Sequence, residues 1–293
     1  MKVSGATFVR NAVIYQYPII ESIKSLLPLC DEIIVNIGKS DDNTKEIILS
    51  VRSEKIKIIE EEWDIALRKN GLILSQQSNI AIENCTGNWI FYLQADEVIH
   101  ENDYEKIYNA MKGYKDNLQV DGLVFDYIHF YGSAWTYQDA RNWYKQEVRI
   151  IRNNGQIRSY GDAQGFRLLD GKKPNAKLTG AKIYHYGWAR PFTIMKNKMI
   201  NFDKLWHDDN YISQKYKDET LVDCFRDLDN LKVFTETHPN VVYENKELLN
   251  LGNLLFIITK REKYLKNRTI RECLKGISKR VPIGVYKGFK LIY

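Results

Sequence analysis

The chain has 293 residues, of which 44% are hydrophobic and 27% are charged, with a formal net charge of +6. This composition is that of a globular protein with a core of its own, and it excludes a largely disordered chain. The apolar run at 254–258 is far shorter than the roughly 20 residues that span a bilayer, and Arg10 and Asn11 interrupt the N-terminal apolar stretch, so neither a membrane span there nor a signal peptide is expected.

The positive charge is concentrated at the C-terminus. From Leu255 onward there are eleven Lys and Arg residues against Glu262 and Glu272, which gives this segment a charge of +9 and leaves −3 for the remainder. Apolar residues at helical spacing between Ile270 and Val281 predict a basic amphipathic helix. Such a helix contacts anionic lipid or docks on its own domain, and both alternatives stay open.

The cysteines are far apart in the sequence and form no CxxC pair. This spacing argues against a disulfide framework or a zinc knuckle and favours a reducing compartment. We therefore expect a cytoplasmic protein, with peripheral contact at the inner face of the membrane if the basic tail binds lipid. The four positions are Cys30, Cys85, Cys224 and Cys273.

The first hundred residues alternate between strand and helix patterns. Short apolar runs between polar turns predict buried strands, and apolar residues three or four apart predict helices. Their alternation predicts parallel βαβ units with right-handed crossovers. In chain order we expect a strand at Val3–Val9, a helix at Tyr17–Leu29, a strand at Glu32–Ile37, a helix opening at Asp42, a strand at Lys55–Glu60, a helix at Gly71–Cys85 and a strand at Asn88–Leu93.

The second half of the chain has a different rhythm. Strands are predicted at 121–130, 146–152 and 180–187, a loop-rich stretch at 155–171, and mainly helices from Pro191 onward. The segment between the first two strands is rich in aromatic residues, which form either a platform for an acceptor sugar or a satellite hydrophobic cluster. Its members are Tyr131, Trp135, Tyr137, Trp143 and Tyr144.

Polar residues follow the strands of the first half. Ligands of parallel α/β sheets bind beyond the carboxyl ends of the strands, which here are the segments 10–11, 36–44, 60–64 and 94–97. The last follows the buried run Trp89–Leu93 and contains Asp96 and Glu97. Such acids can hold Mg²⁺ or Mn²⁺ when a diphosphate completes the ligand set, or they can cap a helix that begins near Glu101.

These segments, taken in order, resemble family 2 glycosyltransferases. Residues 8–11 form an opening strand that ends in Arg-Asn, and 27–35 contain a leucine, a proline and Asp-Glu before an apolar strand. Ser40, Asp42 and Thr44 match a Gly-Ser-x-Asp-x-Thr turn, and 78–81 with 87–90 match the helix and strand that follow. Residues 94–97 read Gln-Ala-Asp-Glu where the family usually has Asp-Ala-Asp-Glu. Two departures are Gly38, where the family often has an Asp near the nucleotide base, and Gln94, which brings no charge.

The resemblance implies an inverting transfer from a nucleotide sugar, assisted by a divalent cation (Mn or Mg). Such a reaction needs a base for the acceptor proton and a cation beside the leaving diphosphate. By resemblance, Asp162 is the expected base, with Glu147 as second candidate, and Asp96 the metal ligand. His185 is a further metal ligand or a hydrogen-bonded, half-buried histidine. The residues expected near the nucleotide are Arg10, Asn11, Ser40, Asp42, Glu61, Gln94 and Ala95.

The predicted fold class is α/β, a GT-A type, Rossmann-like, mostly parallel sheet flanked by helices, with a helical basic C-terminal extension. We expect a catalytic domain over 1–190, with a nucleotide-binding half (1–97) and an acceptor half (98–190), and a helical region over 191–293. The predicted function is transfer of a hexose-type sugar to a glycan or lipid-linked acceptor in surface polysaccharide biosynthesis, with no nucleic-acid partner. The alternatives are a catalytically silent nucleotide- or glycan-binding homologue, which Gln94 and Gly38 motivate, and a sugar nucleotidyltransferase.

Overall fold

The computed structural model describes residues 1–64, 67, 71–217, 228, 230–250, 254–255, 257–259, 261–262 and 287–292. The amphipathic helix predicted between Ile270 and Val281 lies outside these residues. Within them, no helix is long and apolar enough to cross a bilayer.

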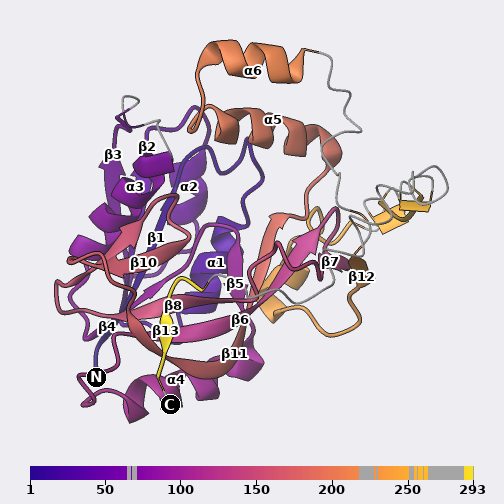
Figure 1. Ribbon diagram of the computed structural model, residues 1–293. Helices are drawn as coiled ribbons and strands as arrows, with labels where there is room; N and C mark the ends of the chain where they lie inside the picture. The colour runs from indigo at the N-terminus through magenta and orange to yellow at the C-terminus, as the bar shows by residue number, and fades with distance from the viewer. Residues whose placement is uncertain are drawn as a thin grey trace.

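The N-terminal half forms a parallel sheet with strand order β3-β2-β1-β4 (Figure 1). All three ladders are parallel, as the alternation of strands and helices predicts. The elements are β1 (Val3–Val9), α1 (Ile19–Leu26), β2 (Glu32–Gly38), α2 (Thr44–Leu49), β3 (Ile56–Glu61), α3 (Leu72–Glu83) and β4 (Trp89–Tyr92).

The C-terminal half adds both parallel and antiparallel strands to the same sheet. β8 lies antiparallel between β4 and β6, while β11 runs parallel to β6. Its strands are β5 (Glu97–Ile99), β6 (Gly122–Tyr131), β7 (Thr136–Gln138), β8 (Gln146–Arg152), β11 (Asn175–Trp188), β12 (Leu231–Val233) and β13 (Lys290–Leu291). The predicted loop-rich stretch contains a separate hairpin, β9 (Ile157–Tyr160) with β10 (Gly165–Leu168).

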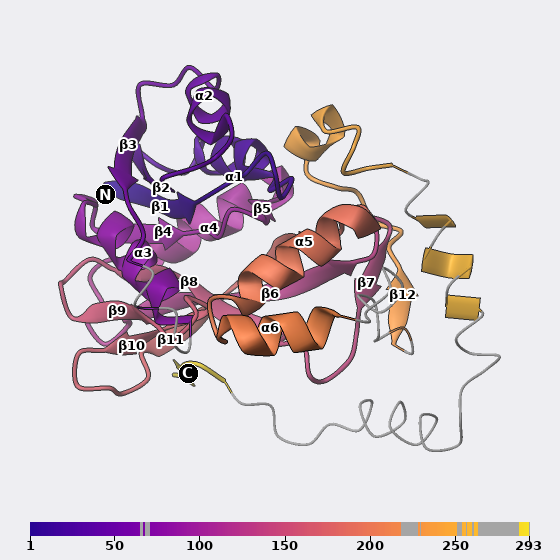
Figure 2. The same cartoon turned by 90° about the horizontal axis from the view of Figure 1, so that it is seen from above.

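Two helices lie at the edge of the sheet where the parallel strands end, over β6 and to one side of β1, β2 and β3 (Figures 1 and 2). These are α5 (Phe192–Asp203) and α6 (Asp209–Tyr216), which lie side by side in both views (Figures 1 and 2). The remaining helical segments are η2 (Glu101–Asp103), α4 (Tyr104–Gly113) and η4 (Asn240–Glu244). The α/β class predicted from the sequence is thus confirmed, and the helices that follow Pro191 pack on the sheet.

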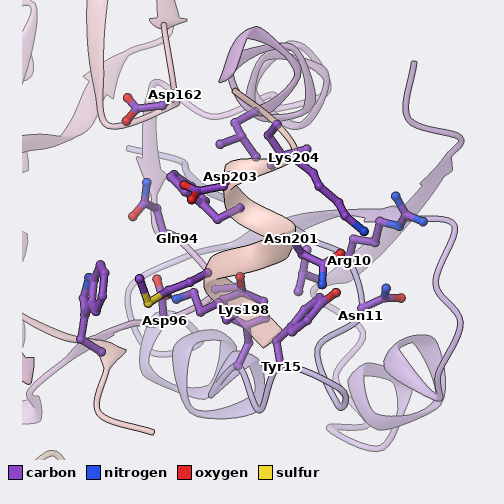
Figure 3. Close-up of a pocket in the computed structure, with 18 of the residues that line it drawn as sticks. Arg10, Asn11, Tyr15, Gln94, Asp96, Asp162, Lys198, Asn201, Asp203 and Lys204 are labelled. Carbon is purple, nitrogen blue, oxygen red and sulfur yellow. Dashed lines mark hydrogen bonds and ion pairs between the residues drawn. The ribbon is translucent and has the colours of Figure 1, made fainter. Parts of the chain in front are cut away.

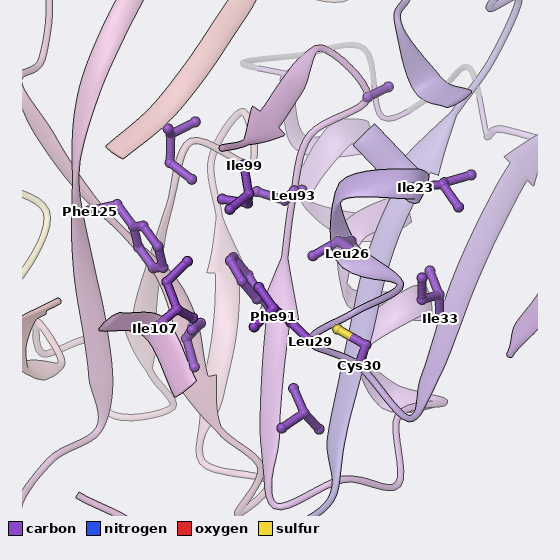
Figure 4. Packing of buried hydrophobic residues seen from close by; sticks show 14 of the residues in the cluster. Ile23, Leu26, Leu29, Cys30, Ile33, Phe91, Leu93, Ile99, Ile107 and Phe125 are labelled. Carbon is purple, nitrogen blue, oxygen red and sulfur yellow. The ribbon is translucent and has the colours of Figure 1, made fainter. Parts of the chain in front are cut away.

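The core lies on both faces of the sheet. On one face Phe91 of β4 stacks on Phe125 of β6 with ring centroids 5.3 Å apart, beneath Leu26 of α1 and Ile107 of α4 (Figure 4). On the other face Ile90 packs against α3. Because successive residues of a strand point to opposite faces and both faces of β4 are buried, both sets of its side chains are apolar, which explains the uninterrupted run before Gln94.

A buried ion pair joins the end of β4 to the second half of the sheet. Arg149 of β8 donates from Nε and Nη2 to the two carboxylate oxygens of Glu97, at 2.7 and 2.8 Å, and neither side chain is exposed. Tyr127 of β6 donates to the same carboxylate at 2.8 Å. The carboxylate of Glu97 therefore binds Arg149 and Tyr127 and does not cap a helix. The cap of η2 is His100, whose side chain accepts a hydrogen bond from the backbone N–H of Asn102.

We expect Glu97→Gln to lower the free energy of unfolding by about 3–5 kcal/mol, because it leaves a buried guanidinium without its counter-ion. Chemical denaturation followed by circular dichroism measures this loss. Lys172→Gln, which breaks the exposed Lys172–Asp170 pair, is the matched control and should leave the midpoint unchanged. Equal effects of the two substitutions would contradict the role given to Glu97.

Candidate functional site

A cavity of about 1160 Å³ opens at the carboxyl ends of the parallel strands, beneath α5 (Figure 3). Arg10, Asn11 and Tyr15 lie on one side of it, and Gln94 and Asp162 on the other. Seven of the eleven predicted site residues line it, namely Arg10, Asn11, Gln94, Ala95, Asp96, Asp162 and His185. Ser40, Asp42, Glu61 and Glu147 are outside its lining.

Ser40 and Asp42 hold the loop that follows β1. The backbone N–H of Asn11, whose φ is 54°, donates to Ser40 Oγ at 3.0 Å. Asp42 accepts from the backbone N–H groups of Val13 and Ile14 at 2.9 and 2.8 Å. These two side chains bind the protein's own backbone and so fix the place of Arg10 and Asn11 in the cavity.

Trp63 takes the space beside Gly38. A Cβ at position 38 would overlap the indole of Trp63, so an aspartate cannot occupy this position while the indole is there. The ring also lies against Phe8, with centroids 6.1 Å apart, and against the guanidinium of Arg10, 5.7 Å from its centroid. Glu61 is exposed at the end of β3, and the cavity wall here combines the indole of Trp63 with Arg10 and Asp41, which lie 3.8 Å apart.

Asp96 is buried among cations at the centre of the site. Its Oδ2 lies 3.0 Å from Lys198 Nζ and 3.7 Å from Arg190 Nη2. Burial raises the pKa of Asp96, but the neighbouring Lys198, His185 and Arg190 outweigh this and hold that pKa well below its usual value. Burial and the neighbouring Arg190 in turn lower the pKa of Lys198 to about 8. Asp96 is therefore an ionised carboxylate at neutral pH.

Two histidines on adjacent strands orient a ring nitrogen toward Asp96. His129 Nε2 lies 2.7 Å from the carbonyl oxygen of Tyr144, which can only accept, so this nitrogen carries the hydrogen. Burial, with His185 close by, lowers the pKa of His129 well below its usual value, so the ring is neutral and its Nδ1 accepts from His185 Nδ1 at 2.9 Å. The Nε2 of His185 then faces Asp96 Oδ1, 3.6 Å away.

Asp96 and His185 fit a divalent cation. Carboxylate oxygen and imidazole nitrogen both bind Mn²⁺, and Asp96 Oδ1 and His185 Nε2 face each other 3.6 Å apart. Gly187 leaves the adjoining space open, since a Cβ there would overlap His185 Nε2. The described residues contain no group of three or more His, Cys, Asp or Glu side chains that could hold a metal, so a diphosphate would have to supply further ligands.

Gln94 ties the end of β4 to the loop that carries Asp162. Its Nε2 donates to the carbonyl oxygen of Ala163 at 3.2 Å, and Ala163 has a φ of 62°, a strained value for a residue with a Cβ. An aspartate at position 94 could not donate this hydrogen bond. The departure from the usual Asp-Ala-Asp-Glu therefore has a local structural reason.

Glu147 is buried behind this loop. It is 2% exposed, and its Oε1 accepts from the backbone N–H of Val148 at 3.0 Å. Burial raises the pKa of Glu147. Of the two carboxylates predicted as the base, only Asp162 lines the cavity.

An aromatic wall closes the side of the cavity formed by the second half of the sheet. Of the five aromatic residues singled out in the sequence, three line it together with Trp188: Tyr131, Trp143 and Tyr144. The other two belong elsewhere, since Trp135 Nε1 donates to the carbonyl oxygen of Leu249 and Tyr137 packs in a cluster around Phe130.

Sequence reasoning missed Lys198, Arg190, His129 and Trp63. The two histidines are opposite each other in the β6–β11 register, which becomes visible only once these strands are paired. Lys198 lies in the segment assigned to a C-terminal extension, yet it lines the cavity. Trp63 could have been suspected from the sequence, because a glycine at position 38 leaves room for a larger side chain nearby.

The model of the family described as "Glycosyl transferase family 2" matches residues 11–171, more than half of the chain. The chain belongs to this family. The matched stretch runs from the loop after β1 to the end of the β9–β10 hairpin, and so includes Asp96 and Asp162. Membership agrees with the GT-A type layout predicted from the sequence, and it does not favour the nucleotidyltransferase alternative.

Among curated proteins the chain is similar to the SPbeta prophage-derived glycosyltransferase SunS of Bacillus subtilis (strain 168), with 27% identity over 169 residues. The match covers 57% of this chain and 36% of that protein, and the glycosyltransferase SunS of Bacillus phage SPbeta matches equally. The chain thus spans about a third of the length of the curated relatives it matches.

Two solved structures are also similar. S. aureus TarS 1–349 in complex with UDP has 14% identity and a TM-score of 0.42, with 92% of this chain and 93% of that chain covered. Glucosyl-3-phosphoglycerate synthase from Mycobacterium tuberculosis, in complex with Mn²⁺, UDP and phosphoglyceric acid, has 14% identity and a TM-score of 0.32, with 43% of each chain covered.

We expect Gln94→Glu to lower the free energy of unfolding by about 1–3 kcal/mol, because a carboxylate would face the carbonyl oxygen of Ala163 in place of an N–H donor. Thermal and chemical unfolding measure the change. Gln156→Glu makes the same chemical change at an exposed position and should stay within about 0.5 kcal/mol of the unsubstituted protein. A stabilised Gln94→Glu variant would show that the tie to Ala163 does not matter.

Proposed function

We propose that the protein is a glycosyltransferase that moves a hexose-type sugar from a nucleotide-sugar donor to a glycan or lipid-linked acceptor with inversion. The observation that carries the proposal is the single cavity where the loop after β1, the ionised Asp96 and the loop bearing Asp162 meet. The loop after β1 would bind the nucleotide, Asp96 would hold the cation beside the diphosphate, and Asp162 would act as the base. Family membership supports the same reaction class.

The donor nucleotide would lie along the side formed by Arg10, Asn11 and Trp63. The flat indole offers a stacking surface for a base, and Arg10 a positive charge for a phosphate. The diphosphate would then point toward Asp96. Mn²⁺ or Mg²⁺ held by Asp96 Oδ1 and His185 Nε2, when bound, would offset the negative charge that grows on the leaving diphosphate.

The acceptor would enter on the opposite side, between the aromatic wall and Asp162. Its hydroxyl oxygen bonds to the anomeric carbon on the face opposite the nucleotide, and the bond from that carbon to the diphosphate oxygen breaks. The electron pair leaves with the nucleoside diphosphate, and the hydroxyl proton passes to Asp162. Attack from the far face inverts the anomeric configuration.

The cellular setting remains part of the proposal. We place the reaction in surface polysaccharide biosynthesis at the cytoplasmic side of the membrane. The charge of the C-terminal segment supports this setting, because its eleven cations would attract a surface of anionic lipid or a lipid-linked diphosphate acceptor.

A thermal-shift panel of nucleoside diphosphates and nucleotide sugars, each with and without Mn²⁺, tests the donor and metal sites together. We expect one nucleotide to raise the melting temperature in a metal-dependent way, since a ligand that binds only the folded state adds about 2.7 kcal/mol at a hundredfold excess over its Kd. Asp96→Ala should abolish the metal-dependent part.

Three outcomes separate the possibilities. A shift that needs the metal and Asp96 supports the proposed site. A metal-independent shift that persists in Asp96→Ala would contradict the metal role while leaving the nucleotide site in place. No shift with any nucleotide or nucleotide sugar would favour a silent homologue over an enzyme.

Asp162→Asn tests the base. We expect kcat to fall by about 100-fold or more, because an amide cannot take the acceptor proton, while the Kd for the donor stays within about twofold, since Asp162 lies across the cavity from Arg10 (Figure 3). Steady-state kinetics and calorimetry measure the two quantities. Asp170→Asn, an exposed acid on the turn after the hairpin, is the control. Unchanged kcat in Asp162→Asn would transfer the role of base to another group.

A further inference from the structure

One lysine of α5 binds the same carboxylate that the proposed metal site uses. Lys198 Nζ donates to Asp96 Oδ2 at 3.0 Å and to the carbonyl oxygen of Gly187 at 2.8 Å. The side chain is 14% exposed and lines the cavity from the middle of the helix. Figure 3 shows Lys198 and Asp96 pointing toward each other beneath α5.

A second cation, Arg190, also lies close to Asp96. Arg190 is 1% exposed and lies 3.7 Å from Asp96 Oδ2, and its Nη2 makes no hydrogen bond within the described structure. Its Nε and Nη1 are held by the carbonyl oxygens of Gln16 and Gly187. Arg190 is therefore fixed in place, and Asp96 keeps a positive neighbour if Lys198 moves away.

The single negative charge of Asp96 is too small to neutralise both Lys198 and a divalent cation. It is a single carboxylate, and a divalent cation at Oδ1 would stand close to the ammonium on Oδ2. Like charges at this distance repel strongly where water is excluded. A bound metal and Lys198 thus compete for Asp96, unless a ligand with several negative oxygens accepts one of them. A diphosphate is such a ligand.

We propose that Lys198 exchanges partners during donor binding: it neutralises Asp96 in the donor-free protein and moves to the diphosphate when metal and nucleotide bind. This inference rests on the proposed function and names a residue that acts on the leaving group. Lys198 is therefore a catalytic residue of the proposed reaction, and in the absence of the donor it opposes metal binding at Asp96.

The geometry permits the exchange without movement of the helix. An ammonium has three N–H donors, of which Asp96 and Gly187 take two, so a phosphate oxygen can accept the third before the bond to Asp96 breaks. The four-carbon stem of lysine rotates easily, and Nζ lies 4.8 Å from the centroid of the Tyr17 ring, which favours a cation in this part of the cavity.

Binding of metal and nucleotide should consequently be coupled. Metal alone must displace Lys198 from Asp96, whereas metal with a nucleoside diphosphate gives Lys198 a new partner. Each ligand then raises the affinity for the other by the same factor. Removing the ammonium should have opposite effects on the two ligands: it frees Asp96 for the metal and takes a contact from the diphosphate.

Lys198→Met removes the ammonium and keeps a flexible side chain of similar length. Mn²⁺ binding in the absence of nucleotide is measured by electron paramagnetic resonance of the free ion. Binding of UDP, GDP, ADP, CDP and dTDP, and of the matching monophosphates, is measured by calorimetry in saturating Mn²⁺. Lys196→Met, on the same helix but outside the cavity lining, is the matched control, and Lys198→Arg keeps the charge.

In Lys198→Met we expect Mn²⁺ alone to bind about tenfold tighter, and the best-binding diphosphate to bind about tenfold weaker, with its monophosphate unchanged. Lys196→Met should match the unsubstituted protein, and Lys198→Arg should lie closer to it than Lys198→Met does. The thermal unfolding of Lys198→Met shows whether this variant is folded. In the folded variant, a fall in both affinities, or no change in either, overturns the exchange while the proposed function stands. If no diphosphate binds the unsubstituted protein, the proposed function fails and this inference with it.

Discussion

The buried contact between Glu97 and Arg149 is the constraint on which the site depends. A bidentate guanidinium–carboxylate pair with no exposed surface tolerates little displacement, because any separation leaves charge without water or partner. Glu97 follows Asp96 directly, and its other oxygen contacts reach the backbone of Gln94 and the hydroxyl of Tyr127. The pair thus fixes the short stretch between β4 and β5, and with it the direction in which Asp96 enters the cavity.

The first half of the fold could be predicted because each of its elements has a local signal. β1, β2 and β4 are buried on both faces and are therefore rich in apolar residues, with a few buried polar residues such as Thr7 and Asn36, and the intervening helices show helical spacing. The loops at the strand ends follow from topology alone, which is why Arg10, Asn11 and Asp96 could be placed in one cavity. Asp42 and Ser40 show the limit of this reasoning, since a strand-end polar residue can equally bind the backbone next to it.

The remaining site residues depend on long-range packing that no local pattern encodes. Lys198 and Asp96 are 102 positions apart, and their contact exists because α5 crosses the open edge of the sheet. Gly38 and Gln94 first look like losses from a family pattern. In the structure each is matched by a partner, Trp63 and Ala163 respectively, so each departure belongs to a pair of positions and cannot be interpreted from one position alone.

The hairpin formed by β9 and β10 pairs only with itself and takes no part in the main sheet. Two hydrogen bonds between Asn79 of α3 and the backbone of Ser159, at 3.2 and 2.8 Å, attach the hairpin to α3. Its tip carries Asp162, whereas the side of the cavity proposed for the nucleotide is built on β1, β2 and β3. Changes in this hairpin that keep Asp162 and the contact between Ala163 and Gln94 can therefore alter the acceptor side while β1, β2 and β3 stay as they are, which makes the hairpin the natural place for related chains to diverge and for an engineer to begin.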